Sequence, residues 1–317
     1  ATLPHTPWYS MGSDVADINN DGLLDFLGSD MLGTTHYKRK LSMGDMQTWF
    51  AIIGRPPQYM RNALYLNTGT DRFMEVAALA GVSKTDWTWS VKFADFDNDG
   101  WVDLYVTNGA ERNWDHSDIM IQARGSQRID TQELKDVWLP TPVRNDKNMA
   151  FRNMGDLEFK SVGESWGLAK ASVSYGSALA DFDGDGDVDI ITNNFEEFAS
   201  VYRNGSIEGN LIKIRLRGSI SNRDGLGAIL RLKTAAGQQV RYHTLTRGYM
   251  SANDTVVHFG LGDVKKINSL AVEWPSGCRQ EFKDLRTNRF YTITEPRESI
   301  APRDPPPPQS SLFASAG

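Results

Sequence analysis

The sequence predicts an all-β protein in which several β-propeller blades, forming a partial propeller, precede a small antiparallel β-sandwich. Three observations carry this prediction. An aspartate-rich loop occurs three times between strand-like segments, the segments around the loops also repeat, and the loops are absent after about residue 208. Repeats are considered before single elements because a missed period leads to the wrong fold.

The three loops lie in repeats with the same order of segments. Each repeat reads as a strand, an acidic loop, a strand, a variable insert, a strand, a tight turn and a strand, as in "NALYLNTGTDRFMEV" from Asn62 and "NMAFRNMGDLEFKSV" from Asn148. The segments are short and rich in β-branched and aromatic residues, which is typical of strands. Four antiparallel strands form one propeller blade, so residues 1–208 are predicted to contain three blades, each with an acidic loop, and two long inserts.

The inserts differ greatly in length. The first runs from roughly Met31 to Arg61, the second from Ala110 to Lys147, and the third is only "FEEF". Because the inserts join equivalent strands, they are expected to emerge on one face of the propeller, where loops often carry function.

After residue 208 the character of the sequence changes. Residues 209–295 contain closely spaced alternating segments such as "LIKIRLRG", "VVHFGLG" and "SLAVEWP", which predict a separate antiparallel β-sandwich. Residues 296–317 are rich in proline and predict an extended linker or tail. A linker suggests that the native chain continues, so the number of blades in the complete protein stays open.

The acidic loops carry oxygen-bearing side chains at regular positions. When each loop is numbered from its first aspartate, positions 1, 3, 5 and 9 are Asp or Asn and position 6 is Gly. Alternate side chains in a tight loop can converge on one point, glycine permits a turn with positive φ, and position 7 offers its backbone carbonyl. The predicted ligands are Asp17, Asn19, Asp21, Leu23 and Asp25 in the first loop, Asp95, Asp97, Asp99, Trp101 and Asp103 in the second, and Asp181, Asp183, Asp185, Asp187 and Asp189 in the third.

This pattern predicts three Ca²⁺ sites. Six or seven hard, mostly anionic oxygens favour Ca²⁺ over softer metals, whereas Mg²⁺ prefers to keep several waters in a stricter octahedron. Without metal the clustered carboxylates would repel one another, and an ion in each loop offsets that repulsion and ties two strands together. We expect the ions to stabilise the blades rather than to catalyse a reaction, with the weakest binding in the first loop because Asn19 is neutral.

Two alternatives to calcium-binding blades follow from the same pattern. An EF-hand begins in the same way but needs a Glu at position 12 and flanking helices. Position 12 is Gly28, Val106 or Thr192, and the flanking segments alternate like strands, so an EF-hand is excluded. Solvated acidic turns that bind no metal are the other alternative, which a full match in triplicate disfavours.

The repeats resemble the FG-GAP, or VCBS-type, repeats of integrin α-subunits and bacterial exported proteins. The later segments "NRDGLGAILRLKT", "HFGLG" and "AVEWPSGCRQEFKDL" resemble the ASPIC/UnbV domain that accompanies such repeats in the cartilage acidic protein-like family. The resemblance covers about residues 10–295. It implies a calcium-binding propeller, normally seven-bladed, in an extracellular or cell-surface protein, with the calcium ligands at the Asp and Asn positions given above and with no catalytic residues.

Three repeats are too few to close a seven-bladed ring. An open ring exposes an unpaired strand edge and an apolar blade face, both of which favour association. The edge is covered by further blades outside this sequence, by a second copy of the chain in a homo-oligomer, or by the inserts and the C-terminal domain; the sequence leaves all three open.

Composition excludes several classes of protein. The formal charge of -6 and a pI near 5.5 argue against nucleic acid as a partner, which requires a clustered basic surface. A single cysteine, Cys278, rules out an intrachain disulfide, and no apolar run is long enough for a transmembrane segment. The first residues carry no signal peptide, so export to the extracellular space, the cell surface or the periplasm would require a signal outside this sequence.

The leading functional hypothesis is a non-enzymatic scaffold that recognises a protein or glycan ligand through its inserts. A structural subunit of a surface assembly is the alternative, and a glycan-active enzyme is a less favoured one, because it needs two carboxylates across a cleft. The candidate ligand contacts are His36, Lys38, Arg39, Lys40, Trp49, Arg55, Tyr59, Trp114, His116 and Trp138, and the candidate acids for an enzyme are Glu111, Asp115, Asp118 and Glu133.

Several other residues are expected to be structural. His243 and His258 lie in alternating strands and are interpreted as satisfied structural residues, and Cys278 has no His partner nearby in sequence. Trp87 and Trp89 are expected to fill interfaces between blades rather than to stack on sugars.

Overall fold

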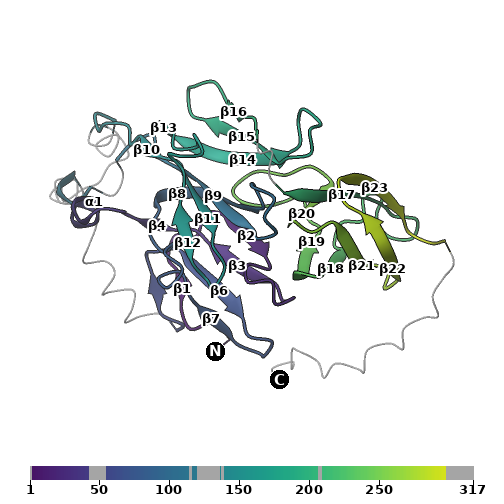
Figure 1. The fold of residues 1–317 in the computed structure, drawn as a ribbon. Coiled ribbons are helices and arrows are strands. Elements are labelled where there is room, and N and C mark those ends of the chain that lie inside the picture. Colours follow the sequence, from purple (N-terminus) through teal and green to yellow (C-terminus); the bar gives the residue numbers. More distant parts are fainter. Residues whose placement is uncertain are drawn as a thin grey trace, which may run out of the picture.

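In the computed structural model, residues 2–42, 55–113, 116–119, 136, 139–205 and 209–297 are described. Over these residues the fold is almost entirely β; its helical parts are α1 (His36–Leu41) and helical residues in the second insert, at 117–119 and 136. Five sheets of three or more strands stand in a propeller-like arrangement: three carry an acidic loop, and two form the C-terminal domain. Figure 1 shows α1 on one side of the three blades and the C-terminal strands on the other.

The first blade has the four antiparallel strands that the repeat predicts, in spatial order β2, β3, β6, β7. Its first acidic loop joins β2 to β3. Its strands are β2 (Ser13–Ala16), β3 (Asp25–Gly28), β6 (Ala63–Asn67) and β7 (Phe73–Glu75).

The second blade has the same four strands and gains a fifth from the first insert, because β4 pairs with β8. Its strands are β4 (Met31–Leu32), β8 (Asp86–Ala94), β9 (Asp103–Asn108), β11 (Met149–Asn153) and β12 (Phe159–Ser161). The strand from the insert fastens the first repeat to the second.

The third blade has three strands rather than the predicted four. They are β14 (Ser174–Ala180), β15 (Asp189–Asn194) and β16 (Ser200–Tyr202). After β16 the chain reaches β17 (Asn210–Arg217), the first strand of the C-terminal domain, so the fourth strand that completes the other blades is missing from the described chain.

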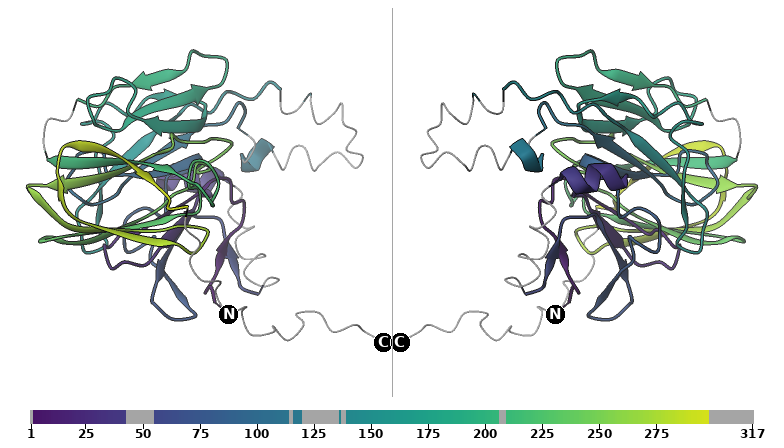
Figure 2. Two further views of the ribbon diagram at one scale, coloured as in Figure 1. Left: turned by 90° about the vertical axis from the view of Figure 1, so that its right-hand side faces the viewer. Right: turned by 90° about the vertical axis from the view of Figure 1, so that its left-hand side faces the viewer.

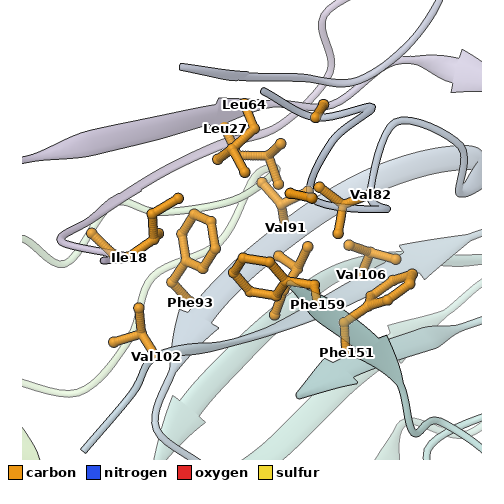
Figure 3. Close-up of a cluster of buried hydrophobic side chains, with 14 of the residues drawn as sticks. Ile18, Leu27, Leu64, Val82, Val91, Phe93, Val102, Val106, Phe151 and Phe159 are labelled. Carbon is orange, nitrogen blue, oxygen red and sulfur yellow. The ribbon is translucent and has the colours of Figure 1, made fainter. Parts of the chain in front are cut away.

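Apolar side chains hold the blades together. One buried cluster joins the first and second blades through side chains such as Leu27 and Leu64 from the first and Val91, Phe93 and Phe151 from the second; Figure 3 shows these side chains converging between the two sheets. A second cluster, which includes Tyr105, Leu179 and Ile190, joins the second and third blades. Because apolar burial supplies most of the stabilisation of a fold, these clusters fix the blades relative to one another.

The C-terminal domain is a sandwich with its core between two sheets. Ile212, Phe259 and Ile293 from one sheet meet Leu230 and Leu270 from the other. The sheets are β20 (Val256–Gly262), β17 (Asn210–Arg217) and β23 (Arg289–Thr294), and β19 (Gly237–Tyr242), β18 (Ile229–Thr234), β21 (Lys266–Glu273) and β22 (Arg279–Arg286). The expectation of a purely antiparallel sandwich is wrong at one pair, because β17 and β23 are parallel.

The loop of residues 243–255, between β19 and β20, reaches into the centre of the partial ring. There Arg247 binds the carboxylate of Asp14 with distances of 2.5 and 2.7 Å, and Gly248 exchanges backbone hydrogen bonds with Ser13. The buried Lys92 donates to the carbonyl oxygen of Arg247 and to Asn253. The C-terminal domain therefore contacts the first strands of the blades, β2, β8 and β14. In the left view of Figure 2, its yellow and green strands lie in front of the blades.

Two short sheets and the inserts complete the structure. The pairs β1 (Thr6–Pro7) with β5 (Gln58–Tyr59) and β10 (Asp146–Lys147) with β13 (Ala171–Ser172) flank the blades. Lys38 of the first insert binds Asp146 of the second at 2.7 Å, and Ser42 pairs with His116. The described parts of the two inserts thus meet on one side of the blades, as their equivalent positions predict. Within the described chain, no helix is both long and apolar enough to cross a bilayer.

Replacing Glu295 by Gln should destabilise the C-terminal domain by about 3 kcal/mol in urea denaturation at neutral pH. The side chain is 1% exposed and accepts hydrogen bonds from the amides of Ser219, Ile220 and Ser221 and from the hydroxyl groups of Ser221 and Ser276. Burial alone would raise the pKa of Glu295, but these hydrogen bonds outweigh it and lower the pKa to about 2.

A depressed carboxylate pKa gives stability that is complete above the unfolded value of about 4.5 and is lost as the pH falls toward 2. The difference between the wild type and Glu295→Gln should therefore shrink across that window. The exposed Glu281 in the same domain gives a matched control, since Glu281→Gln should change stability little. Equal stability of both variants at pH 7 would contradict this role.

Candidate calcium centres and their surroundings

The three acidic loops share one hydrogen-bond network. At position 1, a carboxylate oxygen of Asp17, Asp95 or Asp181 accepts the amide of the glycine at position 6, at 3.0, 2.8 and 3.1 Å. At position 5, the carboxylate accepts the amide of position 7, at 2.8, 2.8 and 3.1 Å. The glycines have φ values of 91°, 97° and 113°, which L-residues rarely adopt. The sequence pattern thus corresponds to one backbone conformation built three times.

Position 9 joins each loop to the third strand of its blade. Both oxygens of Asp103 accept backbone amides, from Phe96 at 2.9 Å and from Asn153 at 2.9 Å. The same two bonds recur at Asp25 and Asp189. Each carboxylate oxygen has two lone pairs and keeps one for a metal.

An asparagine on the third strand is the functional residue that the sequence analysis missed. Asn67, Asn153 and Asn204 are equivalent, and each donates its side-chain amide to the carbonyl oxygen of position 8. The signal was present in the aligned segments "YLN", "FRN" and "YRN".

In two loops, the carboxylates converge closely enough for one ion. Oxygens of Asp95, Asp97 and Asp99 lie within 4.8 Å of one another, and so do those of Asp181, Asp183 and Asp189. Hard oxygen donors gathered in this way suit Ca²⁺. In the first loop, where position 3 is Asn19, the described residues form no such three-carboxylate cluster.

The second loop carries the observation that points most directly to a ligand. Asp95 is 2% exposed, and its Oδ1 atom is buried without a hydrogen-bond partner in the described structure. An unsatisfied buried carboxylate oxygen is costly, and a bound cation would satisfy it. The residues present therefore fit a calcium ion.

Burial changes the acidity of these carboxyl groups. It is the main cause that raises the pKa of Asp17 to about 6, of Asp25 to about 7 and of Asp95 to about 8, and it holds the pKa of Asp103 well above its usual range. In the absence of metal, part of this set is protonated at pH 7.

Calcium binding at pH 7 is therefore expected to release about one to two protons per chain. A raised carboxyl pKa favours the folded protein at low pH and loses that contribution as the pH rises through the folded value. The gain in melting temperature from calcium should consequently be larger at pH 8 than at pH 6. Titration calorimetry in buffers of different ionisation enthalpy measures the release, and the absence of any dependence on buffer would contradict the proton linkage.

The three loops differ in the number of basic side chains that pair with their aspartates. Arg152 binds Asp97 at 2.6 Å and Asp99 at 3.0 Å, and in the third loop Arg203 pairs with Asp183 and Asp185. Lys213 pairs with Asp181. The first loop has three aspartates, the second four with one such cation, and the third five with two, so that each set carries a formal charge of -3. These arginines were also missed by sequence reasoning, although both precede the aligned asparagine.

The loops are bonded to one another in series. Asn20 donates to the carbonyl oxygen of Gly100 at 3.1 Å, and Asn98 donates to the carboxylate of Asp187 at 2.7 Å. Both asparagines occupy position 4 of their loops and have positive φ. A change in one loop therefore reaches the next through a direct contact.

The C-terminal domain contacts all three loops. Arg231 donates to the carbonyl oxygen of Gly22 in the first loop at 3.0 Å. The backbone of Gly260 lies against Asp95 in the second, where a Cβ atom would be only 2.1 Å from its Oδ2 atom. Lys213 binds Asp181 in the third. The three acidic loops thus form the surface on which the sandwich rests, which we call the seat of the sandwich.

The candidate ligand contacts divide into two groups. His36, Arg39, Lys40 and Tyr59 line a cavity of about 390 Å³ beside α1. Lys38 instead has a structural role, because it binds Asp86 at 2.8 Å as well as Asp146. Arg55 is exposed, His116 is partly buried, and Trp49, Trp114 and Trp138 lie outside the described residues.

Of the four carboxylates considered for an enzyme, the structure describes Glu111 and Asp118. Glu111 accepts a hydrogen bond from Tyr175 at 2.6 Å, and Asp118 is exposed. Asp115 and Glu133 lie outside the described residues. The tryptophans are structural, since Trp87 is 6% exposed and Trp89 contacts the rings of Tyr175 and Tyr249.

The expectation for the two histidines is correct for one and wrong for the other. His243 is buried and bonded to the carbonyl oxygen of Asp224 at 3.0 Å. His258 has a buried Nε2 atom with no hydrogen-bond partner in the described structure. Its side chain lies on the face of β20 that lines a cavity, whereas the neighbouring Phe259 points into the core.

Comparison with known proteins gives two family matches and several relatives. Residues 49–106 match the FG-GAP-like repeat, and residues 218–300 match the ASPIC and UnbV domain. Cartilage acidic protein 1 from Homo sapiens is 28% identical over 285 residues, which cover 78% of this chain and 42% of the relative. The proteins of the same name from Mus musculus and Xenopus tropicalis are 29% and 26% identical and are covered over 38% and 42% of their lengths.

The chain thus spans about two fifths of the curated relatives that it matches. Its repeats, its C-terminal sandwich and the propeller-like arrangement of its sheets agree with both matches. The chain thus combines a segment that matches the FG-GAP-like repeat with a later segment that matches the ASPIC and UnbV domain, in a propeller-like arrangement of β-sheets.

Proposed function

We propose that the chain is a calcium-binding, non-enzymatic scaffold module that acts outside the cytoplasm, in the extracellular space, at the cell surface or in the periplasm. The unpartnered Oδ1 atom of Asp95 inside a carboxylate cluster is the observation that carries the calcium assignment. In each loop, the side chains at positions 1, 3, 5 and 9 and the carbonyl group of position 7 would hold one ion. Similarity to cartilage acidic protein 1 supports an extracellular setting.

The ions would neutralise the charge of the carboxylates, and the chain's own hydrogen bonds position the ligands. The amide bonds to positions 1, 5 and 9 orient the carboxylates, and the position 4 asparagines align neighbouring loops. The C-terminal domain rests on this set of loops. Calcium would therefore hold both the blades and the seat of the sandwich.

The ligand is a protein or glycan, and it binds the surface of the inserts beside α1. The cavity lined by His36, Arg39, Lys40 and Tyr59 combines three basic or titratable side chains with an aromatic ring. A homo-oligomer through the third blade, which has only three described strands, is the second candidate for an assembly role.

A glycan array and a protein-interaction screen, performed with calcium, test recognition. The wild type should bind a ligand that Arg39→Ala together with Lys40→Ala loses, while light scattering reports a monomer. The exposed Lys265 and Lys283, far along the chain in the sandwich, provide a double-alanine control of equal charge change. Hydrolysis of a polysaccharide by the wild type would contradict the non-enzymatic assignment, and a stable oligomer would favour the assembly role.

A further inference from the structure

A cavity of about 400 Å³ lies between the blades and the C-terminal sandwich. The innermost strands of the blades contribute Ala16, Phe93 and Leu179, and the sandwich contributes side chains from β17, β19 and β20. Small-molecule sites commonly have volumes of about 300 to 1,000 Å³. The cavity is large enough for a small organic ligand.

Strand alternation explains why the sandwich side of the cavity is basic. In β17, Ile212 and Ile214 point into the sandwich core, so the alternating Lys213 and Arg215 point to the opposite face. His258 on β20 and Phe290 on β23 both pair with Lys213 across the sheet, and both line the cavity. One face of this sheet therefore presents basic and aromatic side chains together.

Two arginines in the wall, Arg215 and Arg241, form no ion pair among the described residues, although the charges of Asp95 and Asp17 interact with Arg241 without a direct ion pair. Arg241 donates to the carbonyl oxygen of Val240 at 3.1 Å and to Gln239 at 2.9 Å, and its guanidinium lies over the ring of Phe259. Arg215 lies over the ring of Phe290 at 5.0 Å. Enclosing a cation without a counter-ion is unfavourable, whereas nearby Arg247 has its carboxylate in Asp14.

The carboxylates in the same wall have other partners or another assignment. Asp181 is bound by Lys213, and Asp95 accepts the amide of Gly100 through one oxygen, while its other oxygen is the unpartnered atom assigned to calcium. Asp254 accepts the amide of Thr255 and is exposed. None of them is an ion-pair partner of Arg215 or Arg241, and the Nε2 atom of His258 in this wall also lacks a partner in the described structure.

We propose that this cavity binds a small organic oxyanion, a sulfate or phosphate monoester, through Arg215 and Arg241. The planar guanidinium fork matches the oxygens of such groups and holds them through charge-assisted hydrogen bonds. His258 lies beside the bound oxyanion, and the apolar side chains from the blades contact the organic part. The site uses none of the proposed calcium ligands for binding and is independent of the function of the inserts.

Titration calorimetry with sodium sulfate, in buffer of constant ionic strength adjusted with sodium chloride, tests the proposal. Saturable binding of sulfate is expected, and glucose 6-sulfate and glucose 6-phosphate should bind more tightly than inorganic sulfate; the stronger of the two identifies the source of the oxyanion. Arg215→Gln should weaken binding about tenfold, the loss expected for a charge-assisted contact.

Arg217→Gln is the matched control, because Arg217 is exposed on the same strand and does not line the cavity; it should bind sulfate within about twofold of the wild type. Arg241→Gln should weaken binding as well, provided that its circular dichroism spectrum and melting temperature show a folded domain. Binding is measured with calcium present, and a protein that proved to bind no calcium but was folded should still bind sulfate, so that failure of the calcium sites leaves this result intact. An absence of saturable binding, or equal affinities of the wild type and Arg215→Gln, would overturn the proposal.

Discussion

Chelation of calcium is expected to lower the free energy of unfolding by about 8 to 12 kcal/mol. A ligand that binds only the folded state contributes about 2.7 kcal/mol at one hundred times its dissociation constant and about 4.1 kcal/mol at one thousand times, and the chain offers three loops. The loss should be large because buried carboxylates such as Asp95 and Asp103 would again face one another without a counter-ion. Differential scanning calorimetry should show a fall in melting temperature of more than about 15 °C.

Single-site variants divide this effect among the loops. Asp97→Asn should remove most of the contribution of the second loop, whereas Asp71→Asn, at an exposed turn outside the loops, should have no effect on the response to calcium. An unchanged melting temperature on chelation would contradict the calcium assignment. If a variant of one loop kept part of the response of the melting temperature to calcium, the remaining part would be the contribution of the other two loops.

Gly260→Ala should destabilise the junction between the sandwich and the second loop by about 3 kcal/mol or more. A Cβ atom at this position would lie 2.1 Å from Oδ2 of Asp95, 2.6 Å from Cα of Asn98 and 2.7 Å from Cγ of Asp95. Neither the backbone of Asn98 nor the buried Asp95 can move without disturbing the loop. We therefore expect weaker calcium binding together with faster proteolysis between the blades and the sandwich.

Gly205→Ala is the matched control for this substitution. It lies in the connection to the same domain, has no positive φ, and a Cβ atom there would meet nothing within 4 Å. Its melting temperature and proteolysis rate should equal those of the wild type. If Gly260→Ala behaved in the same way, the close contact between the sandwich and the second loop would be excluded as a source of stability.

The repeated part of the fold could be predicted because each repeat specifies its own local structure. The alternation of residues in "SVKFADF" and "LYVTN" gave β8 and β9, and the glycines at position 6 gave the turns between them. The parallel pairing of β17 with β23 could not be predicted, since strand alternation fixes which face a side chain takes but not which strand lies beside it. The fifth strand of the second blade arises from an insert and has no counterpart in the other repeats.

Within the candidate site, the sequence predicts the ligands that lie in one loop but not the contacts made by residues far away in the chain. Asp95, Asp97 and Asp99 are brought together by one turn, so that spacing along the chain is sufficient. The contact of Gly260 with Asp95 joins residues far apart in sequence, and only the packed structure reveals it. Arg152 and Asn153 carried a weaker signal, because they recur in the repeats but their targets lie on another strand.

The position of the sandwich on the acidic loops also explains why the expectation that His258 is a satisfied structural residue was wrong. Alternation along β20 puts His258 on the opposite face from Phe259, but it cannot tell whether that face meets solvent, a neighbouring domain or a cavity. The answer depends on where the sandwich rests on the loops, which involves Lys213 and Arg231 at two separate blades.

A crystal structure of protein grown with excess calcium, with anomalous data collected at long wavelength, decides whether the acidic loops are metal sites. We expect one anomalous peak in each loop, bounded by the side-chain oxygens at positions 1, 3 and 5, including the Oδ1 atom of Asp95 that otherwise lacks a partner. Loops without a peak, in which Arg152 and Arg203 remained the sole partners of their aspartates, would contradict it.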